Sequence, residues 1–80
     1  MQIPVIKKLV EMYPLEKLVA AEAAFEEGTD PGIDIEGKDE GEQFTHVIAA
    51  VWILTKMEAD GDDFKTALRA YTQKVRQSIS

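Results

Sequence analysis

The chain has 80 residues, no cysteine and a formal net charge of −6 at pH 7. The lack of cysteine excludes a disulfide framework, thiolate metal ligation and thiol catalysis. Most acidic residues lie between Glu22 and Asp63, where only Lys38 and Lys56 are basic, so neither nucleic acid nor an anionic membrane is expected as a partner.

The first predicted element is a short helix over Ile3–Tyr13. Its apolar residues recur at helical spacing, and Pro4 suits a first helical turn. The expected apolar face consists of Ile3, Ile6, Leu9, Val10 and Tyr13. A strand over Ile3–Ile6 is an alternative, because short apolar runs are ambiguous by period alone.

A second helix is predicted over Leu15–Glu27. Pro14 ends the first helix and can open the next one, and Gly28 supplies a stop. The alanines of this stretch favour helix and allow a neighbour to approach closely. The expected inner face consists of Leu15, Leu18, Val19, Glu22 and Phe25.

The next segment, Ile33–Glu36, alternates apolar and acidic residues with period two. A single short strand needs a partner for its backbone groups. We therefore expect either an extended loop lying on the helices or a two-stranded pairing across a dimer axis. In the second case Ile33 and Ile35 would be interface residues.

The central helix is predicted from a cap at Asp39 to about Met57. Val47–Leu54 contains no polar residue, which in a helix requires burial on several sides. Asp39 and Glu42 have the spacing of a capping box. The apolar run is far shorter than the roughly 20 residues that span a bilayer, so a membrane span is rejected. Trp52, in the middle of the run, is expected to be a core or dimer-interface anchor.

The last predicted helix starts after a cap at Asp62 or Asp63 and has the most regular amphipathic stripe of the chain. Core packing is the ordinary meaning of such a stripe. Its basic residues indicate a solvated face. The stripe consists of Phe64, Leu68, Tyr71, Val75 and Ile79.

Glu42 and His46 form the one pair that suggests a metal. They are four residues apart, so on a helix they share a face and could reach one ion. Two ligands are too few for a closed site, so a dimer would have to bring two pairs together. The competing interpretation is that Glu42 completes the helix cap and His46 hydrogen-bonds at the rim of the core.

No other pattern specifies chemistry. The acidic stretch Asp30–Glu42 fails the calcium-loop spacing in each register tried. The glycines do not form a phosphate-binding loop, and the two serines lie near the end of the chain, far from the histidine. We therefore predict no catalytic residue and no cofactor.

The stretches IPVIKKLVEMYPLEKL and IEGKDEGEQFTHVIAAVWIL resemble a small uncharacterised family of bacterial proteins of about this length. The resemblance covers nearly the whole chain and implies a shared fold without a catalytic signature. Members of that family are associated with gene neighbourhoods that contain thioredoxin-like and peroxiredoxin proteins, so the resemblance implies an accessory role in thiol peroxide defence. A chain without cysteine could not perform the thiol step itself.

We therefore predict an all-α domain over residues 1–80, with three main helices, a short N-terminal helix and an extended segment at Ile33–Glu36. A chain of this length buries only about 60% of its unfolded surface, which favours self-association. The expected protein is a cytoplasmic, non-enzymatic interaction protein that forms a homodimer, with a further protein partner left open. The alternative is a metal-binding protein or metal-dependent enzyme that uses Glu42 and His46 across the dimer.

Overall fold

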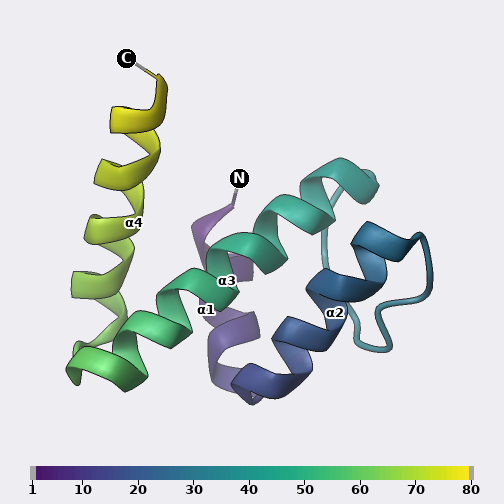
Figure 1. The fold of residues 1–80 in the computed structure, drawn as a ribbon, viewed down its shortest axis with the longest axis horizontal. Coiled ribbons are helices and arrows are strands. Elements are labelled where there is room, and N and C mark those ends of the chain that lie inside the picture. The colour runs from purple at the N-terminus through teal and green to yellow at the C-terminus, as the bar shows by residue number, and fades with distance from the viewer. Residues whose placement is uncertain (1, 80) are drawn as a thin grey trace.

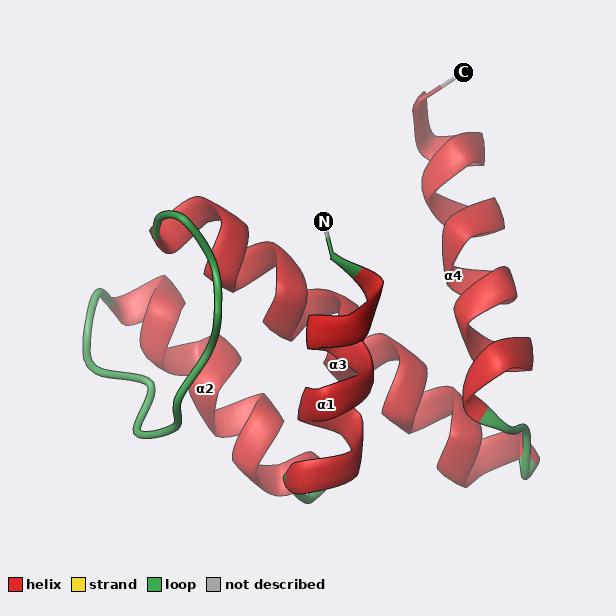
Figure 2. Ribbon diagram, turned by 180° about the vertical axis from the view of Figure 1, so that it is seen from behind, coloured by secondary structure: helices red, strands yellow, loops and turns green. Residues whose placement is uncertain are grey.

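The computed structural model describes residues 2–79 as four α-helices without a strand (Figures 1 and 2). The predicted all-helical fold with a short N-terminal helix is confirmed, and the alternative strand at Ile3–Ile6 does not form. None of the helices described is both long and apolar enough to cross a membrane. The elements are α1 (Ile3–Met12), α2 (Leu15–Glu27), α3 (Glu40–Asp60) and α4 (Phe64–Ile79).

Helix α3 is the centre of the fold, because each of the other helices packs against it. Val47, Ala50 and Ile53 of α3 are fully buried, as expected for its apolar run. In Figure 1, α1 lies behind α3, while α2 and α4 flank it on opposite sides. The front of α3 is therefore the side that none of the other described helices covers.

The helix ends follow local sequence signals. Gly28 and Gly61 end α2 and α3 with φ values of 77° and 71°, the left-handed conformation that glycine adopts without a Cβ penalty. At the start of α3, the Asp39 carboxylate accepts the Glu42 N–H at 2.8 Å. The Glu42 carboxylate in turn accepts the Lys38 N–H at 3.2 Å, one residue earlier than in a standard capping box.

Helix α2 buries only part of the predicted face: Leu18 is fully buried and Phe25 packs against the core, but Val19 does not. Its buried residues are Leu18, Ala21 and Ala24, whereas Val19 is 49% exposed. The small alanine side chains let α2 approach α3 closely, which turns Val19 outward. The prediction was wrong at Val19 because an apolar pattern gives valine more weight than alanine, whereas the buried positions beside Leu18 are alanines.

The loop between α2 and α3 lies on the helices and forms no strand, so the first of the two alternatives for Ile33–Glu36 describes this chain. Ile35 is 8% exposed and belongs to the core, and Ile33 packs against that core. Glu36 also lies 3.9 Å from the Lys8 ammonium of α1. The loop thus covers part of the core that the short helix α1 leaves uncovered.

Helix α4 packs on α3 through its first half only. Ala67 and Tyr71 are buried, but Val75 is 37% exposed, and the side chain of Ile79 lies outside the described residues. Figure 1 shows the C-terminal half of α4 standing away from the other helices. The prediction of core packing along the whole stripe is wrong at Val75, because α4 crosses α3 near its C-terminal end.

Candidate functional site

An open groove runs along the uncovered front of α3, and we call it the α3 groove. Its α3 residues recur at intervals of three and four, so they form one stripe of the helix. Ile48 is 37% exposed there, and the stripe is apolar over its N-terminal part, from Ile48 to Trp52. The groove is lined by Ile48, Val51, Trp52, Thr55, Lys56 and Ala59 of α3 and by Glu22 of α2.

Helix α2 extends the apolar surface beside the groove. Val19 and Glu26 are three residues before and four residues after Glu22, so all three lie along one side of α2. Val19 is the exposed valine of that helix. The α2 border of the groove therefore combines one apolar residue with two carboxylates.

Trp52 joins the groove to α4. Its ring centroid lies 5.6 Å from that of Tyr71, within the range of favourable tilted aromatic pairs. The Lys74 ammonium lies 6.0 Å from the Trp52 ring centroid on the same border, at the limit of a cation–π contact. The half-buried indole thus fixes α4 against α3 and still contributes to the groove.

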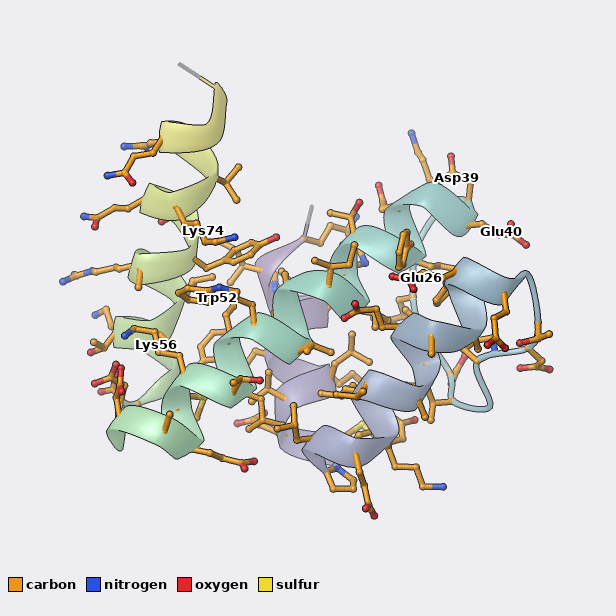
Figure 3. All side chains as sticks on the ribbon, viewed as in Figure 1. Glu26, Asp39, Glu40, Trp52, Lys56 and Lys74 are labelled. Carbon is orange, nitrogen blue, oxygen red and sulfur yellow. The ribbon has the colours of Figure 1, made fainter. Side chains whose placement is uncertain are left out.

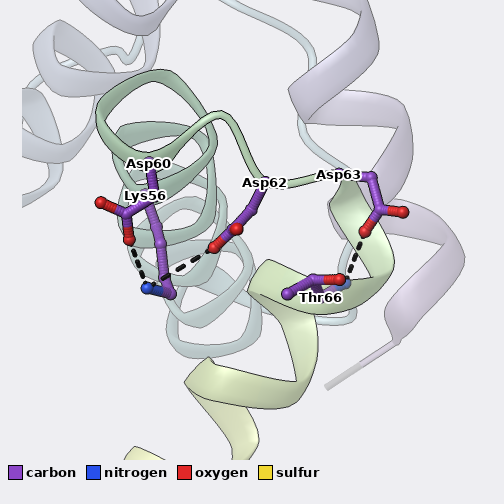
Figure 4. Close-up of polar contacts among 5 residues, drawn as sticks. All are labelled: Lys56, Asp60, Asp62, Asp63 and Thr66. Carbon is purple, nitrogen blue, oxygen red and sulfur yellow. Dashed lines mark hydrogen bonds and ion pairs between the residues drawn. The ribbon is translucent and has the colours of Figure 1, made fainter.

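The C-terminal end of the groove is held by an ion-pair network (Figure 4). The Lys56 ammonium lies 2.6 Å from an oxygen of Asp60 and 3.6 Å from one of Asp62. The hydrogen bond to Asp60 raises the pKa of Lys56, so the ammonium stays charged. One turn later, Asp63 caps α4 by accepting the Thr66 N–H at 2.8 Å. That hydrogen bond lowers the pKa of Asp63.

Charge is distributed unequally across the groove. All fifteen acidic residues precede α4, whereas α4 carries four of the nine basic residues. Figure 3 shows Glu26, Asp39 and Glu40 where α2 ends and α3 begins, and Lys74 at the opposite border beside Trp52. The α2 border of the groove is therefore acidic and the Lys74 end of the α4 border is basic, while Asp60, Asp62 and Asp63 lie just before the start of α4. The four basic residues of α4 are Lys65, Arg69, Lys74 and Arg76.

His46 is a fully buried polar residue, away from the groove. Its Nε2 accepts the Gln2 backbone N–H at 2.9 Å, so the proton of the neutral ring is on Nδ1. The Nδ1–H then donates to the Glu36 carbonyl oxygen at 2.9 Å. His46 thus connects α3 to the N-terminal segment and to the loop before α3.

The structure places Glu42 and His46 one turn apart, with different partners. Glu42 bonds to the backbone at the start of α3, while both His46 ring nitrogens are engaged. A metal could use Nε2 only after displacing the Gln2 N–H. Within residues 2–79, no three His, Cys, Asp or Glu side chains come together in a way that could hold an ion. Metal binding across a dimer stays a prediction, and it requires rearrangement of His46.

The three predicted interface residues have separate positions. Trp52 lines the α3 groove, whereas Ile33 and Ile35 pack on the core of their own chain. The sequence did not indicate that Ile48 and Val51 would line a groove or that Val19 would be exposed. Their exposure depends on where α2 and α4 lie, which the apolar pattern of α3 does not contain.

The chain belongs to a family of unknown function, DUF6952, whose model matches residues 1–80. This agrees with the resemblance to a small uncharacterised family. A comparison with curated proteins and a comparison with solved structures gave no match. The family therefore supports a shared fold and assigns no activity to a residue.

Proposed function

We propose that this protein is a non-enzymatic interaction protein that works as a homodimer, with the α3 groove as the contact between the two copies. The observation that carries the proposal is the uncovered apolar stripe on α3, the helix against which the other three described helices pack. Its large apolar residues are Ile48, Val51 and Trp52, at the N-terminal end of the groove. An exposed apolar strip with polar borders and a tryptophan is typical of a protein contact surface.

A second copy is the occupant that the chain itself favours. Eighty residues give a small core, and a two-fold contact buries the same apolar strip twice. The opposite charges of the two groove borders also suit a copy that carries both. We place the protein in the cytoplasm and propose that it supports thiol peroxide defence by binding another protein. The chain has no cysteine, so it would not carry out the thiol step itself.

The test is the dependence of the molar mass on concentration. Sedimentation equilibrium or light scattering on the wild-type chain should show a monomer–dimer equilibrium. Protein concentrations up to about 1 mM should be measured, so that even a weak dimer is detected. Ile48→Lys should weaken the dimer at least thirtyfold, which corresponds to about 2 kcal/mol for placing a charge in the apolar contact. A wild-type chain that stays monomeric throughout this range would overturn the proposal.

Met12→Lys is the matched control. Met12 is 58% exposed and lies on α1, on the far side of α3 from the groove (Figures 1 and 2). The substitution makes the same change from an apolar to a cationic side chain, and the dimer should be unaffected. Circular dichroism and thermal unfolding of both variants establish that each still folds. Equal weakening by the two variants would mean that the groove is not the contact.

A further inference from the structure

The two helices that border the α3 groove carry opposite charge. Helix α4 contains four basic residues and no acidic one, while α2 contains four glutamates and one lysine. Glu22 lines the groove, and Glu26 lies along the same side of α2. On the opposite border, the Lys74 ammonium approaches the ring of Trp52.

We propose that the second copy docks about a two-fold axis that lies in the face of the groove, so that α4 of each copy lies along α2 of the other. This orientation rests on the homodimer proposed above. In Figure 1 the axis is vertical in the plane of the view. Half a turn about it places a second molecule in front of the first, with its α4 over α2 and its α3 crossing α3.

Charge selects this orientation among the two-fold contacts that cover the groove. An axis that paired α4 with α4 would bring Lys74 of one copy toward Lys74 of the other, and Glu22 and Glu26 of α2 would face the same carboxylates of the second copy. Like charges brought together at an interface are a strong barrier to that arrangement. The crossed arrangement instead forms each attractive contact twice, because the contact is isologous.

The closest opposite charges are expected to be Lys74 of one copy and Glu26 of the other. Figure 3 places the two residues on opposite borders at a similar height, so a vertical axis exchanges their positions. Lys74 is held beside Trp52 in each copy. The pair therefore lies at the rim of the apolar strip, where charges govern orientation and rate of association more than affinity.

Charge reversal tests the arrangement. Lys74→Glu and Glu26→Lys should each raise the dimer dissociation constant on the order of tenfold, because each creates two repulsive contacts in place of two exposed ion pairs. The double variant Lys74→Glu/Glu26→Lys should recover the wild-type constant. An equimolar mixture of the two single variants should form the heterodimer in preference to either homodimer, as read by native mass spectrometry.

Two variants with the same change of charge serve as controls. Arg69 lies five residues before Lys74, about 140° around α4, and Glu27 lies about 100° from Glu26 around α2. Arg69→Glu and Glu27→Lys should therefore leave the constant within about twofold of the wild type. They change the net charge of the chain as the test variants do, so they separate local pairing from overall repulsion.

The outcomes distinguish the orientation from the dimer itself. A wild-type dimer that responds to the test variants no more than to the controls would overturn the crossed arrangement and leave the homodimer standing. A double variant as weak as the single ones would also overturn it. A monomeric wild-type chain would overturn both proposals.

Discussion

Replacing His46 with leucine tests the connection between α3, the N-terminal segment and the loop. Leucine keeps most of the buried volume but loses the hydrogen bonds to the Gln2 N–H and the Glu36 carbonyl oxygen. At about 1 kcal/mol each, the loss is about 2 kcal/mol. A chain of 80 residues has about 4–12 kcal/mol in total. The midpoint of thermal unfolding should therefore fall by about 10 °C.

His46→Ala should cost about 2 kcal/mol more than His46→Leu, because it also leaves a cavity among fully buried residues. Urea unfolding followed by circular dichroism measures both variants. The measurements belong in an Ile48→Lys background at fixed concentration, because dimerisation would add to the apparent stability. Thr45→Ala is the control, since Thr45 is the exposed neighbour on α3 and should change stability by no more than about 0.5 kcal/mol.

Two further readouts examine the hydrogen bonds directly. Nitrogen NMR of the His46 ring should show the proton on Nδ1, and the Gln2 amide should lose its protection from exchange in His46→Leu. A ring protonated on Nε2, or a His46→Leu cost below about 0.5 kcal/mol, would refute the reasoning. Zinc addition extends the test to the metal alternative: that alternative requires zinc to stabilise the wild type and not His46→Leu.

Two predictions concern helix ends. Above the ordinary carboxyl pKa of 3.8, the lowered pKa of Asp63 contributes stability that is lost as pH falls through the lowered value; the stability advantage over Asp63→Asn should therefore disappear in acid, and an advantage that grows in acid would contradict this. Gly61→Ala should cost about 1 kcal/mol because φ is +71° there, whereas Gly41→Ala inside α3 should stabilise by about 0.5 kcal/mol. Urea unfolding of both glycine variants measures the change in the free energy of unfolding, which should have opposite signs. Changes of the same sign would contradict the view that only Gly61 needs the left-handed conformation.

The helix bounds could be predicted because the signals that set them are local. Pro14 separates α1 from α2, Gly28 and Gly61 end their helices, and Asp39 caps α3. Each acts within one turn of itself, the proline and the glycines through backbone geometry and Asp39 through a side-chain hydrogen bond. The order and number of the helices follow from such signals, whatever the helices pack against.

The faces of the helices were harder to predict, because they depend on distances between helices. Ala21 is buried and Val19 is exposed, which reverses the order that side-chain hydrophobicity suggests. A close approach of α2 to α3 favours the smaller residue at the contact. The same limit applies to Val75, whose place in a regular stripe does not reveal that α4 has already left the core.

The existence of the α3 groove depends both on the apolar run of α3 and on where the other helices pack. The apolar run of α3 indicates burial on every side. However, only three other helices are described to cover it, and the loop before α3 covers the core near α1 instead of the front. The apolar run of α3 is thus left with Ile48 and Trp52 at the surface of one side. The C-terminal half of α4, which carries Lys74 and Arg76, also stands beyond the core that the first half contacts. A second copy in the crossed arrangement explains both features, because it would cover the front of α3 and give the acidic side of α2 an oppositely charged neighbour.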